Sequence, residues 1–358
     1  MITLSMIKLS SNFNQIVLVI DGFGQGGVQQ AYRILLREYC KKFDNVYLVI
    51  VQSSSPEITL PYFHNLTVIR LKCKSLTSIF CFFKFNRIIT RIKPDVIIAS
   101  IYVSQIWTAL AKPKNTKLIW VEHNTYLNRT DSQWRLMRML SKRVDKIVGV
   151  SNDVSKLTQI NLRKVTVTIP NPCTFRSLEY IKHNRSSDYV FVSRMNRQKN
   201  PELMLRSFAS IVEKLATASK LHLVGDGDLL VSLKQLSKEL GIENRCVFHG
   251  WLQIELVQEL MLNASTLVST SIIEGMSLVR LEALASGCCV VTTNTGGTHL
   301  FDSISKNGFF VVNSEIDAIG QAMLESLKPI YWLNSAVLAR TRIVENFNPE
   351  KISTSLIE

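Results

Sequence analysis

Short runs of apolar, often β-branched residues alternate along most of the chain with longer segments in which apolar residues recur at helical spacing. This alternation predicts parallel sheets built from strand–helix–strand units. The strands predicted in the first half are residues 15–20, 46–51, 67–71, 95–99, 118–121 and 146–150. A helix is predicted from Val28 to Tyr39, because Tyr32, Leu35 and Leu36 recur at helical spacing.

Two prolines and a polar stretch interrupt this pattern near the middle of the chain. Pro170, Pro172 and the polar residues 182–188 mark the expected domain boundary. Beyond it, strands are predicted at residues 189–192, 221–224, 246–248, 266–270 and 288–292. The helices predicted between them are residues 201–215, 229–240, 253–262 and 278–286.

The predicted fold class is α/β, with two doubly wound, Rossmann-like domains that face each other across a cleft. We expect an N-terminal domain over residues 1–170, a C-terminal domain over residues 171–345 and a tail over residues 346–358. In open sheets of this kind, ligands bind beyond the carboxyl ends of the strands. Functional residues are therefore expected in the loops that follow strands.

The composition is typical of a protein with packed cores, since 46% of the 358 residues are apolar and 20% are charged. No apolar run reaches the ~18–20 residues of a membrane-spanning helix, and the N-terminus lacks the pattern of a secretory signal. The seven cysteines are odd in number and include no CxxC pair, which argues against a disulfide or zinc framework. These features predict a cytoplasmic protein.

The net charge of +14 lies almost entirely in the first half. Residues 1–170 hold 24 Lys and Arg against nine Asp and Glu, whereas residues 171–358 hold 18 against 19. Residues 70–93 carry seven basic residues, no acidic ones and a cluster of five Ile and Phe side chains. Three interpretations stay open, in this order of preference: contact with an anionic membrane surface, a core helix with a solvated basic face, and nucleic-acid binding.

A glycine-rich loop follows the first predicted strand, in residues 21–28. Glycines there let the backbone approach a phosphate at the start of a helix. Gly22, Gly24 and Gly27 also fit the G-x-G-x-x-G pattern of dinucleotide-binding proteins. That pattern needs an acidic residue after the second strand, and residues 51–55 contain none. A dinucleotide site is therefore disfavoured, and a tight turn without a ligand is the other alternative.

His123 follows the fifth predicted strand, where it either packs as an ordinary histidine or faces the cleft. In the second half, Arg194, Arg197 and Lys199 follow a strand and precede a helix that Pro201 opens. Such cations form a diphosphate clamp, because Arg binds phosphate bidentately and Lys acts as a point charge. Ordinary loop charge is the alternative.

Two glutamates flank the start of the helix predicted at residues 278–286. Glu274 lies in the preceding loop and Glu282 lies just over a turn into the helix. The backbone N–H groups of Ser277, Leu278 and Val279 lie between them, at the positive end of the helix. This arrangement suits a sugar nucleotide, whose phosphate would accept from the N–H groups and whose hydroxyls would donate to the carboxylates.

The order of these motifs resembles the retaining GT-B-fold glycosyltransferases of glycosyltransferase family 4, of the type that builds bacterial surface polysaccharides. The resemblance covers most of the chain and is strongest over residues 189–297. The matching pieces are Gly26-Gly27, His123, Ile169-Pro170-Asn171, Arg194-x4-Lys199, Gly225-Asp226-Gly227, Glu274-x7-Glu282 and Gly296-Gly297.

The resemblance implies transfer of a sugar from a UDP- or GDP-linked donor, with retention and without a metal ion or other cofactor. Arg194 and Lys199 would neutralise the departing diphosphate. Glu274 would hold the transferred sugar and Glu282 the ribose. The backbone of Ser277, Leu278 and Val279, with that of Gly26 and Gly27, would bind the donor, and His123 would lie near the reacting carbon.

Four positions depart from the family pattern: Gln29, Gln30, Cys289 and Leu300. The resemblance also implies a lipid-linked or oligosaccharide acceptor in lipopolysaccharide O-antigen or capsule synthesis. With the basic first half, it predicts peripheral attachment to the inner face of the cell membrane and no nucleic-acid partner. The alternatives are a catalytically silent nucleotide-sugar-binding protein, a nucleic-acid-binding protein, and a nucleotide-sugar epimerase with the same fold.

Overall fold

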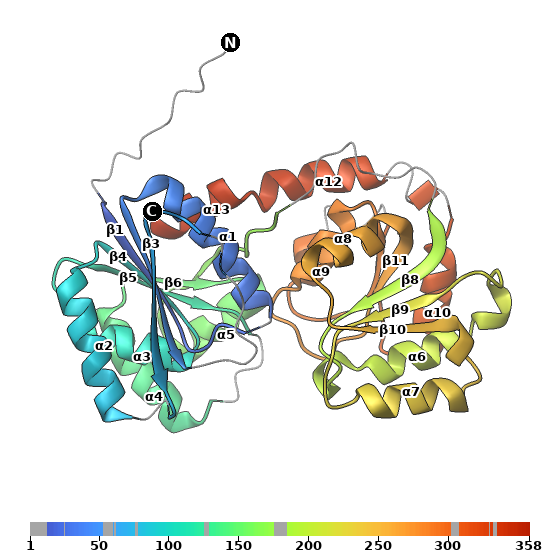
Figure 1. The fold of residues 1–358 in the computed structure, drawn as a ribbon, viewed down its shortest axis with the longest axis horizontal. Coiled ribbons are helices and arrows are strands. Elements are labelled where there is room, and N and C mark those ends of the chain that lie inside the picture. Colours follow the sequence, from blue (N-terminus) through green and yellow to red (C-terminus); the bar gives the residue numbers. More distant parts are fainter. Residues whose placement is uncertain are drawn as a thin grey trace, which may run out of the picture. The chain divides into compact units, whose positions relative to one another are not determined.

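The structure is a computed structural model that describes residues 13–24, 26–52, 60, 62–75, 78–124, 129–174, 185–301, 308–328, 330–331 and 335–358. The chain forms two compact units (Figure 1). Unit 1 comprises Met1–Pro172 and Pro349–Glu358, and unit 2 comprises Cys173–Asn348.

Unit 1 is built on a parallel seven-stranded sheet with the order β3-β2-β1-β4-β5-β6-β7. The strands are β1 (Gln15–Ile20), β2 (Asn45–Gln52), β3 (Leu66–Cys73), β4 (Val96–Ser100), β5 (Lys117–Glu122), β6 (Lys146–Gly149) and β7 (Val167–Thr168). The central strands are buried on both faces, which explains why they are continuously apolar in sequence.

Helices cover both faces of this sheet. On one face, Val17 and Val19 share a core with α2 (Ile79–Ile92), α3 (Tyr102–Ala111), α4 (Asp131–Leu140) and α5 (Asn152–Leu162). On the other face, α1 (Gly27–Lys42) packs beside α13 (Pro349–Ile357), and the Tyr39 hydroxyl donates to the carbonyl oxygen of Ser353.

Residues 349–358, predicted from the sequence as part of a tail, are therefore an integral part of unit 1. Three lysines bind backbone carbonyls of α13 and the residue after it. Lys42 reaches Glu350, Lys146 reaches Ser355, and Lys117 reaches Ile357 and Glu358. Lys146 and Lys117 lie at the C-terminal end of α13, where a helix carries unpaired carbonyl groups and partial negative charge, so lysines suit that place. Lys42 binds the first turn of the helix instead.

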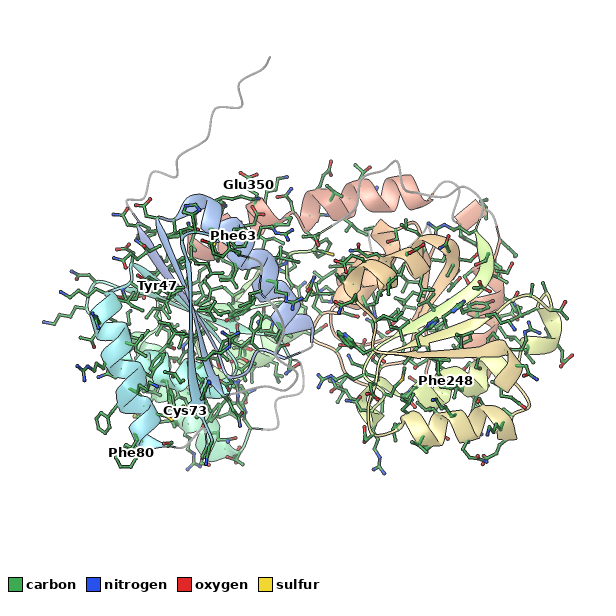
Figure 2. The ribbon with its side chains drawn as sticks, viewed as in Figure 1. Tyr47, Phe63, Cys73, Phe80, Phe248 and Glu350 are labelled. Atoms are coloured by element: carbon green, nitrogen blue, oxygen red, sulfur yellow. A yellow bond between two sulfur atoms is a disulfide. The ribbon has the colours of Figure 1, made fainter. Side chains whose placement is uncertain are left out.

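The basic, aromatic residues 79–92 form α2, and this helix is amphipathic. Phe85 and Ile89 are buried in the core of unit 1, whereas Ile79, Phe80 and Phe83 are exposed. Phe80 projects outward from the start of the helix (Figure 2). None of the described helices combines the length and the apolar character needed to cross a membrane.

One cysteine prediction is wrong. Cys73, at the end of β3, is joined to Cys81 in α2 by a disulfide, with the two Cα atoms 6.1 Å apart. The sequence predicted no disulfide framework because no cysteine pair has a recognisable spacing. The two residues are eight positions apart in sequence, and they meet because α2 packs against β3.

Unit 2 is built on a parallel six-stranded sheet with the order β10-β9-β8-β11-β12-β13. The strands are β8 (Ser186–Val192), β9 (Leu221–Val224), β10 (Cys246–Gly250), β11 (Ala264–Ser269), β12 (Cys289–Thr293) and β13 (Phe309–Val312). One face packs against α6 (Pro201–Ala209), α7 (Leu230–Glu239) and α10 (Ile316–Glu325). Among the other described helices, α8 (Ile254–Asn263) and α9 (Leu278–Ala285) lie against β11, and α12 (Ser335–Asn346) lies against α9.

The strand order of each unit reverses at one place, between β1 and β4 in unit 1 and between β8 and β11 in unit 2. Doubly wound sheets bind ligands beyond the carboxyl ends of the strands at this switch point.

The helix predicted over residues 201–215 ends earlier, at Ala209. Ser207 and Ser210 donate to backbone carbonyls three or four residues earlier, and a 3-10 turn at Val212–Lys214 follows.

Candidate functional site

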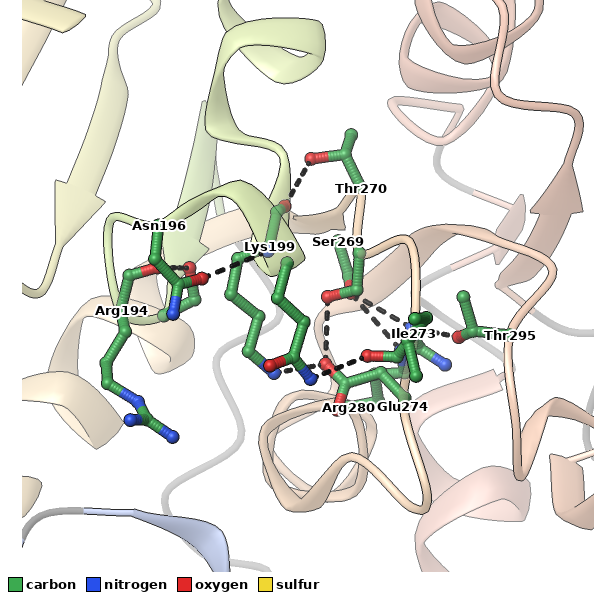
Figure 3. Close-up of polar contacts among 12 residues, drawn as sticks. Arg194, Asn196, Lys199, Ser269, Thr270, Ile273, Glu274, Arg280 and Thr295 are labelled. Atoms are coloured by element: carbon green, nitrogen blue, oxygen red, sulfur yellow. Dashed lines mark hydrogen bonds and ion pairs between the residues drawn. The ribbon is translucent and has the colours of Figure 1, made fainter. Parts of the chain in front are cut away.

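Three loops of unit 2 pack together at the carboxyl ends of β8, β11 and β12 (Figure 3). The loop after β8 is joined to the loop after β11 by the Ile272 N–H, which donates to the Gln198 carbonyl at 2.9 Å. The Thr270 hydroxyl donates to the Asn200 carbonyl at 2.7 Å. The Thr293 hydroxyl, at the end of β12, donates to the Ser271 carbonyl at 2.6 Å. These bonds fix the loops that carry the predicted site residues.

Lys199 and Glu274 form an ion pair at the centre of this site. The Lys199 Nζ lies 2.5 Å from Glu274 Oε1, and the Ser271 hydroxyl donates to the same oxygen at 2.8 Å. Burial by itself would raise the pKa of the Glu274 carboxyl, but Lys199 and Arg280 hold this pKa below its usual value. Glu274 is therefore a charged, hydrogen-bonded carboxylate.

Arg194 belongs to the same loop as Lys199 but is exposed, and its side chain extends away from the Lys199–Glu274 pair (Figure 3). The backbone around it is held closely. Gly225 has a φ of +127°, and a Cβ there would lie 1.9 Å from the carbonyl oxygen of Ser193. The glycine-rich turn after β9 thus packs directly on the backbone beside Arg194.

The N-terminus of α9 points into the same group of loops. Ser277 is the N-cap residue, and Leu278 and Val279 begin the helix. No acidic residue lies in its first turn. The side chain of Ser277 makes no capping hydrogen bond. The backbone N–H groups and the positive end of the helix dipole therefore favour an anion here.

Glu282 lies one turn into α9. Its burial raises the pKa of its carboxyl to about 7, so Glu282 is partly protonated at neutral pH. Burial also raises the pKa of the Cys173 thiol, and the charge of Glu282 adds to this effect. A carboxyl that is readily neutral is suited to exchange hydrogen bonds with ligand hydroxyls.

Three predicted site residues, Gly26, Gly27 and His123, lie in unit 1, whereas the others lie in unit 2. Gly26 and Gly27 begin α1, which starts without a capping side chain from the described residues. A Cβ on Gly26 would lie 2.6 Å from Gln29 Oε1, the far end of a flexible side chain, whereas a Cβ on Gly27 would meet nothing within 4 Å.

His123 follows β5 and hydrogen-bonds through Nε2 to the Ser100 hydroxyl at the end of β4, at 3.0 Å. Burial lowers the pKa of the His123 imidazole to about 4, so the ring is neutral at physiological pH. Its Nδ1 is buried and has no hydrogen-bond partner among the residues that the structure describes.

The sequence analysis of unit 1 missed Asp21. Its carboxylate, at the end of β1, accepts hydrogen bonds from the backbone N–H groups of Val103 and Ser104 and from the Ser104 hydroxyl. It thereby caps α3, beside Ile101, whose φ of 74° is unusual for a β-branched residue. An aspartate directly after a strand is the only signal that the sequence offered.

The sequence analysis also missed Arg280, a fully buried residue of α9 whose positive charge lowers the pKa of the Glu274 carboxyl. Its signal was a charged residue between the apolar residues Val279 and Leu281 of α9. Among the described residues, no group of three or more His, Cys, Asp and Glu side chains is arranged to hold a metal ion.

Comparisons with known proteins agree with this architecture. Residues 25–173 match the family described as Glycosyltransferase Family 4, and residues 179–329 match Glycosyl transferases group 1. The two matches together cover most of the chain. A solved structure of Anabaena HepE in complex with UDP superposes with a TM-score of 0.77 and 17% identity, covering 96% of this chain and 98% of that one. The chain belongs to the GT-B glycosyltransferases.

Two sequence relatives of this glycosyltransferase carry the same enzyme class in their names. An uncharacterized glycosyltransferase of Methanocaldococcus jannaschii is 32% identical over 130 residues, which are 36% of this chain and 33% of that protein. An α-1,4-N-acetyl-D-galactosaminyltransferase of Campylobacter jejuni, named for an acceptor built on diNAcBac-PP-undecaprenol, is 24% identical over 290 residues. That match covers 78% of this chain and 79% of the relative.

Proposed function

We propose that this glycosyltransferase moves a sugar from a nucleotide-sugar donor to a lipid-linked or oligosaccharide acceptor in surface-polysaccharide synthesis. The observation that carries the proposal is the Lys199–Glu274 pair beside the N-terminus of α9, at the switch point of unit 2. A cation and backbone N–H groups suit the diphosphate, and a charged carboxylate suits the sugar hydroxyls. The UDP bound to HepE favours a UDP-linked donor over a GDP-linked one.

In this proposal each site residue has one task. Lys199 and Arg194 neutralise the diphosphate as it leaves, together with the N–H groups of Ser277, Leu278 and Val279. Glu274 accepts hydrogen bonds from the transferred sugar, and Glu282 accepts them from the ribose. The backbone at Gly26 and Gly27 binds the donor from unit 1. His123 presents Nδ1 near the reacting carbon.

The proposed reaction retains the configuration at the anomeric carbon and uses no metal ion. A departing diphosphate needs positive charge and fixed hydrogen-bond donors, which Lys199, Arg194 and the start of α9 supply. The acceptor is proposed to be attached to a polyprenyl diphosphate, because the C. jejuni relative is named for such an acceptor.

The test is a transfer assay on the purified protein with UDP-, GDP- and ADP-linked sugars and a saccharide on a short polyprenyl diphosphate. We expect release of UDP that depends on the acceptor and persists in EDTA, with an α-linkage from an α-linked donor by NMR. A β-linked product would contradict retention, and loss of activity in EDTA would contradict metal independence. Failure with every donor, together with no thermal stabilisation by any nucleotide, would overturn the proposed function.

We also propose that unit 1 attaches peripherally to the cytoplasmic face of the cell membrane through α2. Ile79, Phe80 and Phe83 are exposed at the start of this helix. Lys84, Arg87 and Arg91 follow, and all three are exposed. Apolar side chains insert at the level of the lipid headgroups, and each nearby basic residue contributes about 1 kcal/mol on an anionic surface.

Co-sedimentation with vesicles tests this attachment. We expect binding to vesicles that contain phosphatidylglycerol at low salt, weak binding to phosphatidylcholine alone, and loss of binding when Lys84, Arg87 and Arg91 are changed to Glu. The matched control changes three exposed lysines elsewhere, Lys156, Lys214 and Lys238, to Glu. Equal binding by the α2 variant and the wild type would show that α2 is not the attachment site.

A further inference from the structure

Gln198 joins the two loops that carry Lys199 and Glu274. Its backbone carbonyl oxygen accepts a hydrogen bond from the Ile272 N–H at 2.9 Å, and its side-chain Nε2 donates to the carbonyl oxygen of Ile273 at 3.1 Å. One residue of the loop after β8 thus holds two consecutive residues of the loop after β11. Because two bonds at different points resist rotation as well as separation, they fix the orientation of one loop relative to the other.

Both chain neighbours of Lys199 are bonded to the loop after β11. Gln198 precedes it, and Asn200 follows it with a carbonyl oxygen that accepts from the Thr270 hydroxyl at 2.7 Å. The side-chain bond of Gln198 ends one residue before Glu274, whose carboxylate pairs with Lys199 (Figure 3). The relative places of the ammonium and the carboxylate therefore depend on these bonds between the loops.

Apolar packing does little to hold this part of the loop after β11. The Ile272 side chain is 59% exposed, so it buries little apolar surface. Gln198 is exposed as well, and substitutions of exposed side chains change the free energy of unfolding only slightly. The amide of Gln198 therefore affects where the loop lies more than whether unit 2 folds.

We infer that Gln198 is a positioning residue of the donor site, which holds the loop after β11 so that Glu274 and Lys199 keep their relative places during transfer. This inference rests on the proposed function, since that function assigns Lys199 to the diphosphate and Glu274 to the transferred sugar. Groups that are fixed in advance stabilise a transition state best, and a displacement of about 1 Å can lower a rate ~10²-fold. Gln198 itself acts only through the two loops that it joins.

Hydrogen exchange of the Ile272 amide tests this attachment without any substrate. Protein labelled with 15N-isoleucine shows the amide in NMR spectra, and its signal is assigned through Ile272→Val. Gln198→Met keeps the length of the side chain but has no donor for the Ile273 carbonyl oxygen. We expect the Ile272 amide to exchange about tenfold faster in Gln198→Met than in wild type, because local opening of the loop exposes it more often. Equal rates overturn the inference.

The matched control is Gln235→Met, the same substitution at an exposed position of α7, where the amide donates to Glu239. It leaves the exchange rate of the Ile272 amide unchanged. Gln198→Glu is a second test variant of the same length, because its carboxylate accepts hydrogen bonds and donates none to the Ile273 carbonyl oxygen at neutral pH. We expect faster exchange in this variant too, and a rate equal to that of the wild type contradicts the inference.

Transfer kinetics separate this inference from the proposed function. With an active wild type, Gln198→Met lowers kcat about tenfold and raises the donor KM by a smaller factor, whereas Gln235→Met retains both values. In the Lys199→Met background, Gln198→Met costs less than in wild type, because the pair that Gln198 positions is already lost. An unchanged kcat, or an equal cost in both backgrounds, contradicts the inference and leaves the proposed function intact. A wild type that transfers no sugar contradicts the proposed function, and the exchange of the Ile272 amide still decides whether Gln198 holds the loop.

Discussion

The guanidinium of Arg129 donates two hydrogen bonds to the Glu122 carboxylate, with N–O distances of 3.0 and 3.1 Å. Both side chains are buried, at 8% and 3% exposure. Arg129 also lies over the rings of Tyr102 and Trp134. Since Glu122 ends β5 and Arg129 precedes α4, this pair joins the end of β5 to the start of α4.

We expect Arg129→Met to reduce the free energy of unfolding by about 3–5 kcal/mol, because Glu122 would be left buried with an unpaired charge. Adding Glu122→Gln should restore much of that loss. Urea denaturation of the two single variants and the double variant measures this coupling. Additive losses in the double variant would mean that the pair does not act as a unit.

Lys199→Met and Glu274→Gln should each lower kcat/KM for transfer by about 10²-fold, because each removes a charged group that the donor contacts in the proposed site. The double variant should lose less than the product of the two losses, since the residues share an ion pair. Lys214→Met, which changes an exposed lysine outside the proposed site, is the control and should retain activity. Steady-state kinetics with the preferred donor decides the outcome.

The pKa of Glu282 leads to a dependence of stability on pH. Its folded-state value of about 7 is above the usual 4.5, so the folded protein binds an extra proton between these values. This contribution to stability is fully present below pH 4.5 and is lost as the pH rises through 7. Glu282→Gln should therefore gain stability relative to wild type as the pH increases over this window.

Thermal unfolding of wild type and Glu282→Gln at several pH values between 4.5 and 8 measures that difference. Glu213→Gln, at an exposed position of the same unit, should show no such trend relative to wild type. A constant difference between Glu282→Gln and wild type would mean that Glu282 titrates normally.

Two glycines with positive φ separate backbone strain from steric overlap. Gly241 has a φ of +68° and open space around a Cβ, whereas Gly225 has a φ of +127° and a Cβ there would meet the Ser193 carbonyl oxygen. We expect Gly241→Ala to cost about 1 kcal/mol of unfolding free energy and Gly225→Ala ~3 kcal/mol or more. Chemical denaturation compares them, and equal losses would contradict the close packing at Ser193.

The sheets were predictable because their strands are apolar on both faces. The strand predicted at residues 15–20, with its apolar run from Ile16 to Ile20, coincides with β1, and the strand predicted at residues 221–224 coincides with β9. Short elements were not predicted from the sequence, because the two residues of β7 are too few to show a pattern. The disulfide between Cys73 and Cys81 was not predicted either, because it depends on the packing of α2 against β3.

The sequence predicted which loops form the candidate site, but not which side chains contact each other there. Glu274 and Lys199 each stand after a strand, which sequence periodicity can locate, but their pairing joins residues 75 positions apart. Arg280 was missed because helical spacing identifies a buried face without saying what a charge on that face contacts. His123 was located by its strand, whereas its neutral, partly unpartnered ring follows from burial.

The return of α13 to unit 1 makes that unit discontinuous in sequence. A recombinant fragment that stops at residue 172 lacks the helix that packs on α1 and receives hydrogen bonds from Lys42, Lys117 and Lys146. Residues 173–348, in contrast, form one uninterrupted segment. Removal of the last ten residues would therefore damage the half of the enzyme that is farthest from them in the linear chain, and an affinity tag fused after Glu358 would be placed beside Lys117.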